Sequence, residues 1–148
     1  MFGLLKKVFG TKHDRDVQAM LPVVESINAL YATLAPLNDD DIRAKSDALR
    51  ARITEAKAEY EGDREQMRNE LQSDSITHDE RLDIYQRVEE SEKEEYAAVA
   101  ALLEEMLPEA FALVKEVARR LTERKHSYQV SGHTQTWAMV PYDVQLMG

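Results

Sequence analysis

Gln72-Ser73-Asp74-Ser75-Ile76-Thr77-His78-Asp79-Glu80 is the stretch that decides the fold, because it separates two long helical patterns. Its first four residues are polar. Thr77 and Glu80 have the spacing of a capping box, in which each side chain bonds the other residue's backbone N–H at the start of a helix. The stretch therefore predicts a turn and then a returning helix, which together make an antiparallel helical hairpin.

The two predicted helices of the hairpin carry narrow apolar seams. The first, over about residues 39–71, begins with a cap at Asn38 and three acidic residues that favour the helix dipole. Its seam comprises Leu49, Ile53, Ala56, Tyr60, Met67 and Leu71. The returning seam comprises Leu82, Tyr85, Val88, Tyr96, Val99, Leu103 and Met106, with Glu89 and Glu92 interrupting it. Each seam is wide enough for one partner helix. Because Glu89 and Glu92 interrupt the returning seam, the middle of the hairpin is expected to be looser than its ends.

Helical patterns also flank the hairpin. Residues 13–36 are predicted to form a helix that buries Val17, Met20, Leu21, Val24, Ile27 and Leu30, with an end or a kink near Pro22. At Leu107-Pro108-Glu109 the chain is expected to restart, since proline suits a first helical turn. In the helix that follows, Phe111, Val114, Val117, Ala118 and Leu121 are predicted to be buried and Lys115, Arg119, Arg120 and Arg124 to face solvent.

The C-terminal part of the sequence breaks the helical pattern. Residues 125–136 are polar and are predicted to form a mobile connection. Residues 137–148 are mostly apolar and include several aromatic and β-branched side chains, which indicates an extended tail with no following element to pair with it. The prediction is a mostly α chain with segments 1–12, 13–36, 37–107 and 108–148, of which the last looks like a truncated start of another domain.

Composition and charge narrow the functional classes. The chain has 148 residues, 32% of them charged and 7% aromatic, with no cysteine, which suits long helices and excludes disulfides and thiolate metal sites. Between Thr54 and Met106 there are seventeen acidic and six basic side chains, a net of −11 against −9 for the whole chain. Such a segment would repel phosphates, so nucleic acid is not expected as a partner. No apolar run is long enough to span a bilayer, and no signal-peptide core is present.

The first residues have a membrane-like pattern. Phe2, Leu5 and Phe9 share one helical face, and Lys6 and Lys7 flank it. An apolar stripe with adjacent lysines binds the headgroup region of an anionic membrane. The same stripe would also serve to pack on the protein or to join two copies of it, and the sequence leaves these alternatives open.

Residues that could carry chemistry are few. His126 and His133 could share a metal only if their loop folded back, and a solvated loop is the simpler interpretation. The pairs Glu89/Glu90 and Glu104/Glu105 lie in an acid-rich helix and are interpreted as solvated. The sequence contains neither a serine or cysteine nucleophile motif nor a glycine-rich phosphate loop. No catalytic residue and no metal ligand is therefore predicted in this chain.

Several collinear stretches together resemble the SecA family, the motor ATPases of bacterial protein export. They are Val8-Phe9-Gly10-Thr11-Lys12, Ile27-Asn28-Ala29-Leu30, Leu37-Asn38-Asp39-Asp40-Asp41-Ile42, Leu107-Pro108-Glu109-Ala110-Phe111-Ala112, and Tyr142-Asp143-Val144-Gln145-Leu146-Met147-Gly148. Typical members join the equivalents of Arg52 and Leu107 by a short loop, so the acidic hairpin is a departure from the family pattern.

The resemblance implies a function. In that family this region opens a RecA-like nucleotide-binding domain, and the glutamine matching Gln145 contacts the adenine of ATP, with Tyr142 beside it. ATP and magnesium would be bound by the full-length protein, since the chain ends before the Walker loops. The implied partners are the SecYEG channel, preproteins and anionic phospholipid, at the cytoplasmic face of the inner membrane.

A different class of function remains open at this point. The chain could be a complete acidic adaptor or chaperone-like scaffold with a membrane-surface N-terminus, and a homodimer is compatible with either class. This alternative accounts for the hairpin but not for the apolar tail. The partner of the hairpin is not indicated by the resemblance.

Overall fold

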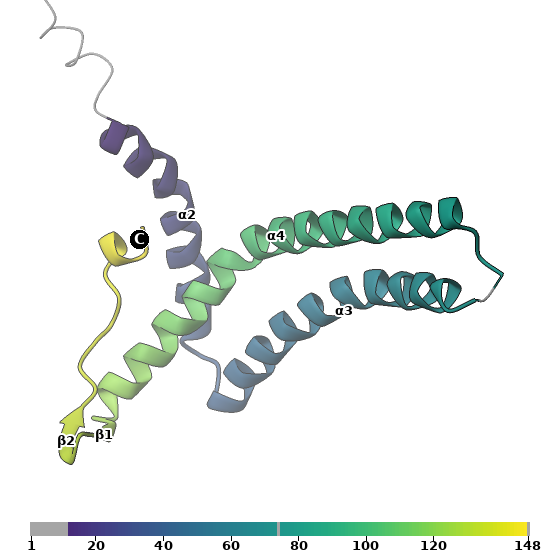
Figure 1. Cartoon of the computed structure of the whole chain (residues 1–148). Helices are drawn as coiled ribbons and strands as arrows, with labels where there is room; N and C mark the ends of the chain where they lie inside the picture. The colour runs from purple at the N-terminus through teal and green to yellow at the C-terminus, as the bar shows by residue number, and fades with distance from the viewer. Residues whose placement is uncertain (1–11, 74, 148) are drawn as a thin grey trace, which may run out of the picture. The chain divides into compact units, whose positions relative to one another are not determined.

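The computed structural model describes residues 12–73 and 75–147, except for the side chain of His13. Its elements in chain order are α2 (Lys12–Leu34), α3 (Asp39–Leu71), α4 (His78–Glu123), β1 (Ser127–Val130), β2 (His133–Thr136) and the 3-10 turn η1 (Asp143–Gln145) (Figure 1). Three long helices and one small sheet confirm the prediction of a mostly α chain. No helix of the described part is long and apolar enough to cross a membrane.

Helices α3 and α4 form the predicted antiparallel hairpin. Cross-helix ion pairs join Arg52 to Glu105, Arg64 to Glu95 and Glu70 to Arg87. Positions rise along α3 as they fall along α4, which is the signature of antiparallel helices. The capping box is also present, because Glu80 Oε2 accepts from the backbone N–H of Thr77 at 2.8 Å and Glu80 N–H donates to Thr77 Oγ1 at 3.3 Å.

The buried face of α4 in the hairpin differs from the predicted seam. Met106 is buried as predicted, and Val88 and Val99 are half-buried. Leu82, Tyr85, Tyr96 and Leu103 are instead exposed, and Ile84 and Ser91, which were not in the predicted seam, are buried. Apolar residues occupy two neighbouring faces of this helix, and spacing alone does not distinguish them. Glu95, the ion-pair partner of Arg64, is on the buried face. The Arg64–Glu95 pair therefore helps to determine which face of α4 packs on α3, whereas the prediction was based on apolar spacing alone.

The predicted restart at Leu107-Pro108-Glu109 was wrong, because α4 continues through Pro108 without a break. Proline removes one backbone donor inside a helix and crowds the preceding turn. Met106 before it and Ala112 and Leu113 after it are buried. Packing on both sides of the proline therefore holds the helix together. Likewise, α2 continues through Pro22.

The predicted mobile connection was also wrong, because it contains an antiparallel β-hairpin. Ser127 pairs with Thr136 and Val130 with His133. The two residues between the strands, Ser131 and Gly132, have positive φ angles of 49° and 82°. Positive φ at both central positions matches the right-handed twist of a two-residue β-hairpin. A polar segment with alternating side chains and a Ser-Gly turn was thus a strand signal.

The chain divides into two compact units, one of Met1–Ile42 with Leu107–Gly148 and the other of Arg43–Met106. The second unit is the hairpin. The described core of the first unit contains Val24, Ile27, Leu34, Ile42, Ala112, Leu113, Ala118 and Leu146. This core therefore joins α2, the start of α3, the end of α4 and the C-terminal turn.

Candidate functional site

A polar junction forms in the first unit where α2 ends and α3 begins. Asn38 Oδ1 accepts from the backbone N–H groups of Asp40 at 2.8 Å and Asp41 at 2.9 Å. Asp41 Oδ2 in return accepts from the Asn38 N–H at 3.1 Å. These reciprocal bonds satisfy donors that a helix start leaves without partners. The predicted cap at Asn38 is confirmed.

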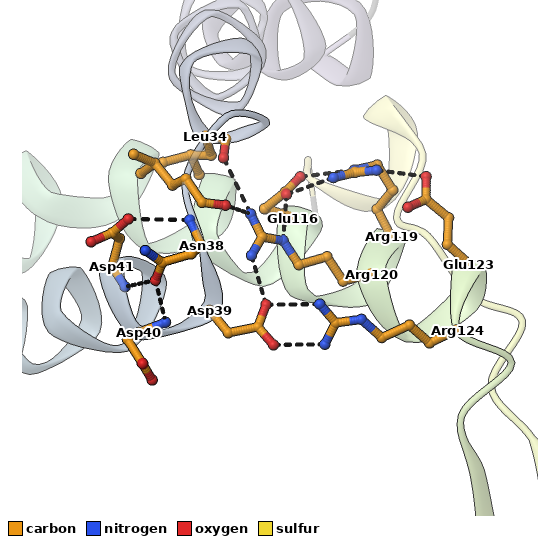
Figure 2. Close-up of polar contacts among 11 residues, drawn as sticks. Leu34, Asn38, Asp39, Asp40, Asp41, Glu116, Arg119, Arg120, Glu123 and Arg124 are labelled. Atoms are coloured by element: carbon orange, nitrogen blue, oxygen red, sulfur yellow. Dashed lines mark hydrogen bonds and ion pairs between the residues drawn. The ribbon is translucent and has the colours of Figure 1, made fainter.

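Arg120 of α4 ties this junction together, as Figure 2 shows. Its Nη2 donates to the carbonyl oxygen of Leu34 at 3.3 Å, at the end of α2, and to that of Leu37 at 2.6 Å, in the connection to α3. Its Nη1 donates to Asp39 Oδ1 at 2.7 Å. Its Nε donates to Glu116 Oε1 at 2.7 Å. One guanidinium thus connects the C-terminus of α2 and the residues after it, the N-terminus of α3, and the C-terminal part of α4.

Glu116 is a fully buried carboxylate in the same cluster. It accepts from Arg119 Nε at 2.9 Å and Arg119 Nη2 at 2.7 Å, in addition to its bond with Arg120. The hydrogen bonds from Arg119 lower the pKa of Glu116; burial opposes this shift and the bond from Arg120 reinforces it. Glu116 is consequently held as an anion.

Asp39 completes the cluster at its exposed edge. Arg124 donates to it through both terminal nitrogens, Nη1 to Oδ2 at 2.6 Å and Nη2 to Oδ1 at 2.9 Å. This bidentate contact is the main reason that the pKa of Asp39 lies far below its usual range, and Arg120 adds to it. A hollow of about 470 Å³ lies beside the cluster and is lined by Asp39, Arg119, Arg120 and Arg124 among others. Because each of these arginines is engaged by a carboxylate, the cluster is suited to joining helices.

A second polar network attaches the C-terminal turn to α2 and α4. Asp143 Oδ1 accepts from Asn28 Nδ2 at 3.1 Å and from Lys115 Nζ at 3.3 Å. Lys115 Nζ also donates to Asn28 Oδ1 at 2.7 Å and lies 5.2 Å from the centre of the Tyr31 ring. The bonds from Asn28 and then Lys115 lower the pKa of Asp143. The Asn28–Lys115–Asp143 network is therefore the polar support of the turn.

Gln145 and Tyr142 lie on this turn. The Gln145 Oε1 accepts from the Tyr142 N–H at 2.9 Å, and the Gln145 N–H donates to the Tyr142 carbonyl at 2.9 Å. Leu146, the next residue, is buried in the core, while the Tyr142 side chain is 75% exposed. Leu146 and Asp143 thus attach the turn to the rest of the first unit, whereas Gln145 and Tyr142 are exposed to solvent.

The structure corrects the predicted orientation of the basic residues on α4. Lys115 and Arg120 were expected to face solvent, yet their side chains are only 12% and 11% exposed. The expected buried stripe was wrong for Phe111, Val114 and Val117, which are exposed, and right for Ala118. A sequence signal was available: Glu116, Arg119, Arg120, Glu123 and Arg124 are three or four residues apart, the spacing of ion pairs on one helix face.

The remaining predicted site residues are at the N-terminus and in the β-hairpin. Phe2, Leu5, Lys6, Lys7 and Phe9 lie outside the described residues. His126 and His133 lie at the base and at the turn of the β-hairpin, on exposed backbone. Within the described ranges, no group of three or more His, Asp or Glu residues is arranged to hold a metal ion.

Comparison with known proteins gives one consistent family. The SecA DEAD-like domain model matches residues 5–148. The chain is 43% identical to the protein translocase subunit SecA of Chlorobium phaeobacteroides, 40% to that of Prosthecochloris aestuarii and 38% to that of Chlorobaculum tepidum. Each match covers the whole chain, hairpin included, and 14% of the relative. No solved structure matches the chain.

Proposed function

The chain belongs to the SecA DEAD-like domain family, and from this premise we propose that it acts as part of a SecA-type translocase that couples ATP hydrolysis to preprotein export. The chain spans about one seventh of the length of the curated relatives that it matches, which are named protein translocase subunit SecA. The activity, substrates and partners of a whole translocase are accordingly proposals for this chain.

The observation that carries the proposal is the supported turn bearing Gln145. We assign to Gln145 the contact with the adenine base of ATP, with Tyr142 beside it. A primary amide offers one acceptor and two donors, which is the pattern complementary to the N6 and N7 edge of adenine. Gln145 Oε1 uses one lone pair on the Tyr142 N–H and keeps the second. Asp143 and its partners Asn28 and Lys115 hold the backbone of this turn in place.

The phosphates of ATP and its magnesium ion need groups that are not in this sequence. Phosphate loops supply a glycine-rich backbone, a lysine and a hydroxyl, and this pattern is missing from the 148 residues. We therefore propose that phosphate and magnesium are bound elsewhere in the translocase and that these 148 residues alone do not hydrolyse ATP. Calorimetry is expected to find no micromolar ATP affinity for the isolated chain, and a micromolar value would contradict this assignment.

A chimeric translocase tests the assignment of Gln145. Residues 1–148 replace the matching segment in the SecA of Chlorobium phaeobacteroides, and ATP-driven translocation of a preprotein into SecYEG vesicles is measured. The chimera is expected to be active. Gln145→Ala should raise the KM for ATP about tenfold, the equivalent of one good hydrogen bond.

Gln135→Ala is the matched control, because Gln135 is an exposed glutamine on β2. It should leave the KM unchanged. An equal rise of the KM in both variants, or a folded chimera without translocation, would count against the proposal.

The N-terminal residues are proposed as the membrane-contacting part, at the cytoplasmic face of the inner membrane. The proposal depends on the sequence of Phe2, Leu5, Lys6, Lys7 and Phe9. Co-sedimentation with vesicles containing anionic phospholipid is expected to weaken strongly in Phe2→Asp and in Lys6→Glu. Unchanged binding in both variants would leave packing or self-association as the role of this segment.

A further inference from the structure

One face of α4 in the hairpin unit carries an exposed apolar stripe. Leu82 is 49% exposed, Tyr85 53%, Tyr96 78% and Leu103 48%. Exposed apolar side chains that gather on one face, unlike single scattered ones, mark an interaction site. Together with the two exposed glutamates between them, these residues form what we call the outer stripe: Leu82, Tyr85, Glu89, Glu92, Tyr96 and Leu103.

The outer stripe has the spacing of a coiled-coil seam. Its members follow one another at three, four, three, four and seven residues, so a single helix laid along α4 contacts all of them. The residues of α4 that meet α3 are on another face, because Ile84 and Ser91 are buried and Glu95 pairs with Arg64. At about 3.6 residues per turn, the two faces are about a third of a turn apart. Packing on α3 therefore leaves the outer stripe exposed.

The charges of the outer stripe indicate the chemistry of its partner. Glu89 and Glu92 occupy the two central positions, and both are exposed. Lys93 Nζ donates to Glu89 Oε1 at 2.7 Å, but both side chains are exposed and a surface ion pair of this kind is weak. The hairpin between Thr54 and Met106 also has a net charge of −11. A helix with apolar residues at both ends of its seam and basic residues in the middle is complementary to this pattern.

We propose that the outer stripe binds a basic amphipathic helix of a partner protein. A second copy of this chain is a poorer occupant, because two outer stripes aligned in either direction bring Glu92 of one copy beside Glu92 of the other. Each hairpin also carries the same net negative charge, so two copies repel each other. The outer stripe lies in the hairpin unit, and the inference does not depend on the role assigned to Gln145.

A peptide-binding measurement with the 148-residue protein tests the proposal. The probe is a fluorescein-labelled helical peptide about as long as the stripe, with leucine at the outer positions of its seam and lysine at the two central ones. The comparison peptide has glutamate at these two positions and is otherwise identical. Anisotropy at about 0.15 M salt is expected to show at least about tenfold tighter binding of the lysine peptide. Equal affinity for the two peptides would overturn the proposal.

Two pairs of glutamates on α4 provide a matched comparison. Glu89→Gln with Glu92→Gln removes the charges of the outer stripe and should weaken binding of the lysine peptide about tenfold. Glu90 and Glu94 are exposed on another face of the same helix, where they line a hollow shared with α3. Glu90→Gln with Glu94→Gln should therefore change the affinity about threefold or less. Equal losses in the two double variants would mean that only net charge is sensed, and would overturn the proposal.

Tyr96→Ala tests the apolar part of the outer stripe. Because Tyr96 is 78% exposed, the thermal unfolding midpoint should not change, while the affinity for the lysine peptide should fall at least about tenfold. Met139→Ala is the control, since Met139 is 64% exposed and belongs to the first unit, and it should leave the affinity unchanged. Unchanged affinity in Tyr96→Ala would overturn the proposal. So would a dimer of the free protein in sedimentation equilibrium that Tyr96→Ala abolishes, because a second copy would then be the occupant.

Discussion

At the scale of single residues, Arg120 is the side chain on which the first unit depends most. It bonds the carbonyl groups of Leu34 and Leu37 at and just after the end of α2, Asp39 at the start of α3, and the buried carboxylate of Glu116. A buried charge is tolerated only when its hydrogen bonds are satisfied. Arg120 therefore satisfies backbone and side-chain acceptors at once, which neither a lysine nor an apolar residue would do.

Replacing this arginine is expected to destabilise the first unit strongly. Arg120→Met keeps much of the side-chain volume but leaves Glu116 with fewer donors and leaves the Leu37 carbonyl without its partner. The expected loss is about 2–4 kcal/mol in the free energy of unfolding, measured by urea titration. Arg124→Met is the control, because Arg124 bonds only Asp39 in this cluster and is 59% exposed. A loss in Arg124→Met equal to that in Arg120→Met would contradict the central role of Arg120.

The carboxylates of both polar networks make the free energy of unfolding depend on pH. The pKa values of Asp39, Glu116 and Asp143 are all lowered by hydrogen bonds from cationic or amide donors. For such groups the unfolded chain binds protons first, so their contribution is complete above the ordinary carboxyl pKa of about 4. Stability should fall as the pH falls below about 4, and a urea midpoint series from pH 7 to pH 3 should show it. In Arg120→Met the slope below pH 4 should be smaller, and an unchanged slope would exclude this cluster as its source.

At the scale of elements, the hairpin contains an ion pair where an apolar residue would normally lie. Arg64 and Glu95 face each other with side chains only 9% and 17% exposed, and Arg64 Nη1 has no hydrogen-bond partner in the described part of the chain. A buried ion pair contributes little net stability because desolvation offsets the attraction. We infer that this pair specifies how α3 and α4 align, a role in which buried polar residues have been found in paired helices.

This inference predicts opposite results for single and double substitution. Arg64→Leu alone leaves the Glu95 charge half enclosed and should lower the free energy of unfolding by about 3–5 kcal/mol. Arg64→Leu with Glu95→Leu should return the value to within about 1 kcal/mol of the wild type or above it. Thermal unfolding followed by circular dichroism measures both. A double variant as unstable as the single one would show that the pair itself stabilises the hairpin.

At the scale of the whole molecule, the two compact units contain different structural features. The first contains the polar junction, the Asn28–Lys115–Asp143 network and the turn with Gln145, and the second is the acidic hairpin. The two polar networks are therefore formed by residues of the first unit.

Removing the hairpin is expected to leave the first unit folded. Arg52 Nη2 lies 2.7 Å from Glu105 Oε1, so the two helices are adjacent at this level and a short linker can join them. Deletion of residues 53–104 with a four-residue glycine–serine linker should preserve the fluorescence of Trp137 and the amide protection of Leu146, whose N–H bonds Tyr142. Loss of Leu146 protection would show that the first unit requires the hairpin.

Local patterns in the sequence determined which segments are helical and where the hairpin turns. The caps at Asn38 and Thr77 depend on residues three positions apart, so their chemistry is complete within one helical turn. The seam of α3 was likewise recognisable, because Leu49 is buried and Ile53, Ala56, Tyr60, Met67 and Leu71 are half-buried as predicted. The family resemblance also came from the sequence, and the comparisons confirm it.

Only the tertiary structure decided which face of α4 is buried and which charges lie inside. Lys115 meets Asn28 and Asp143 across 87 and 28 positions of the chain, and Arg120 meets Asp39 across 81. Helical periodicity records spacing along one element, whereas the burial of a charge depends on partners that other elements bring to it. The polar cluster at the helix junction and the support of the Gln145 turn both arise from such distant partners, which is why spacing alone placed these basic residues in solvent.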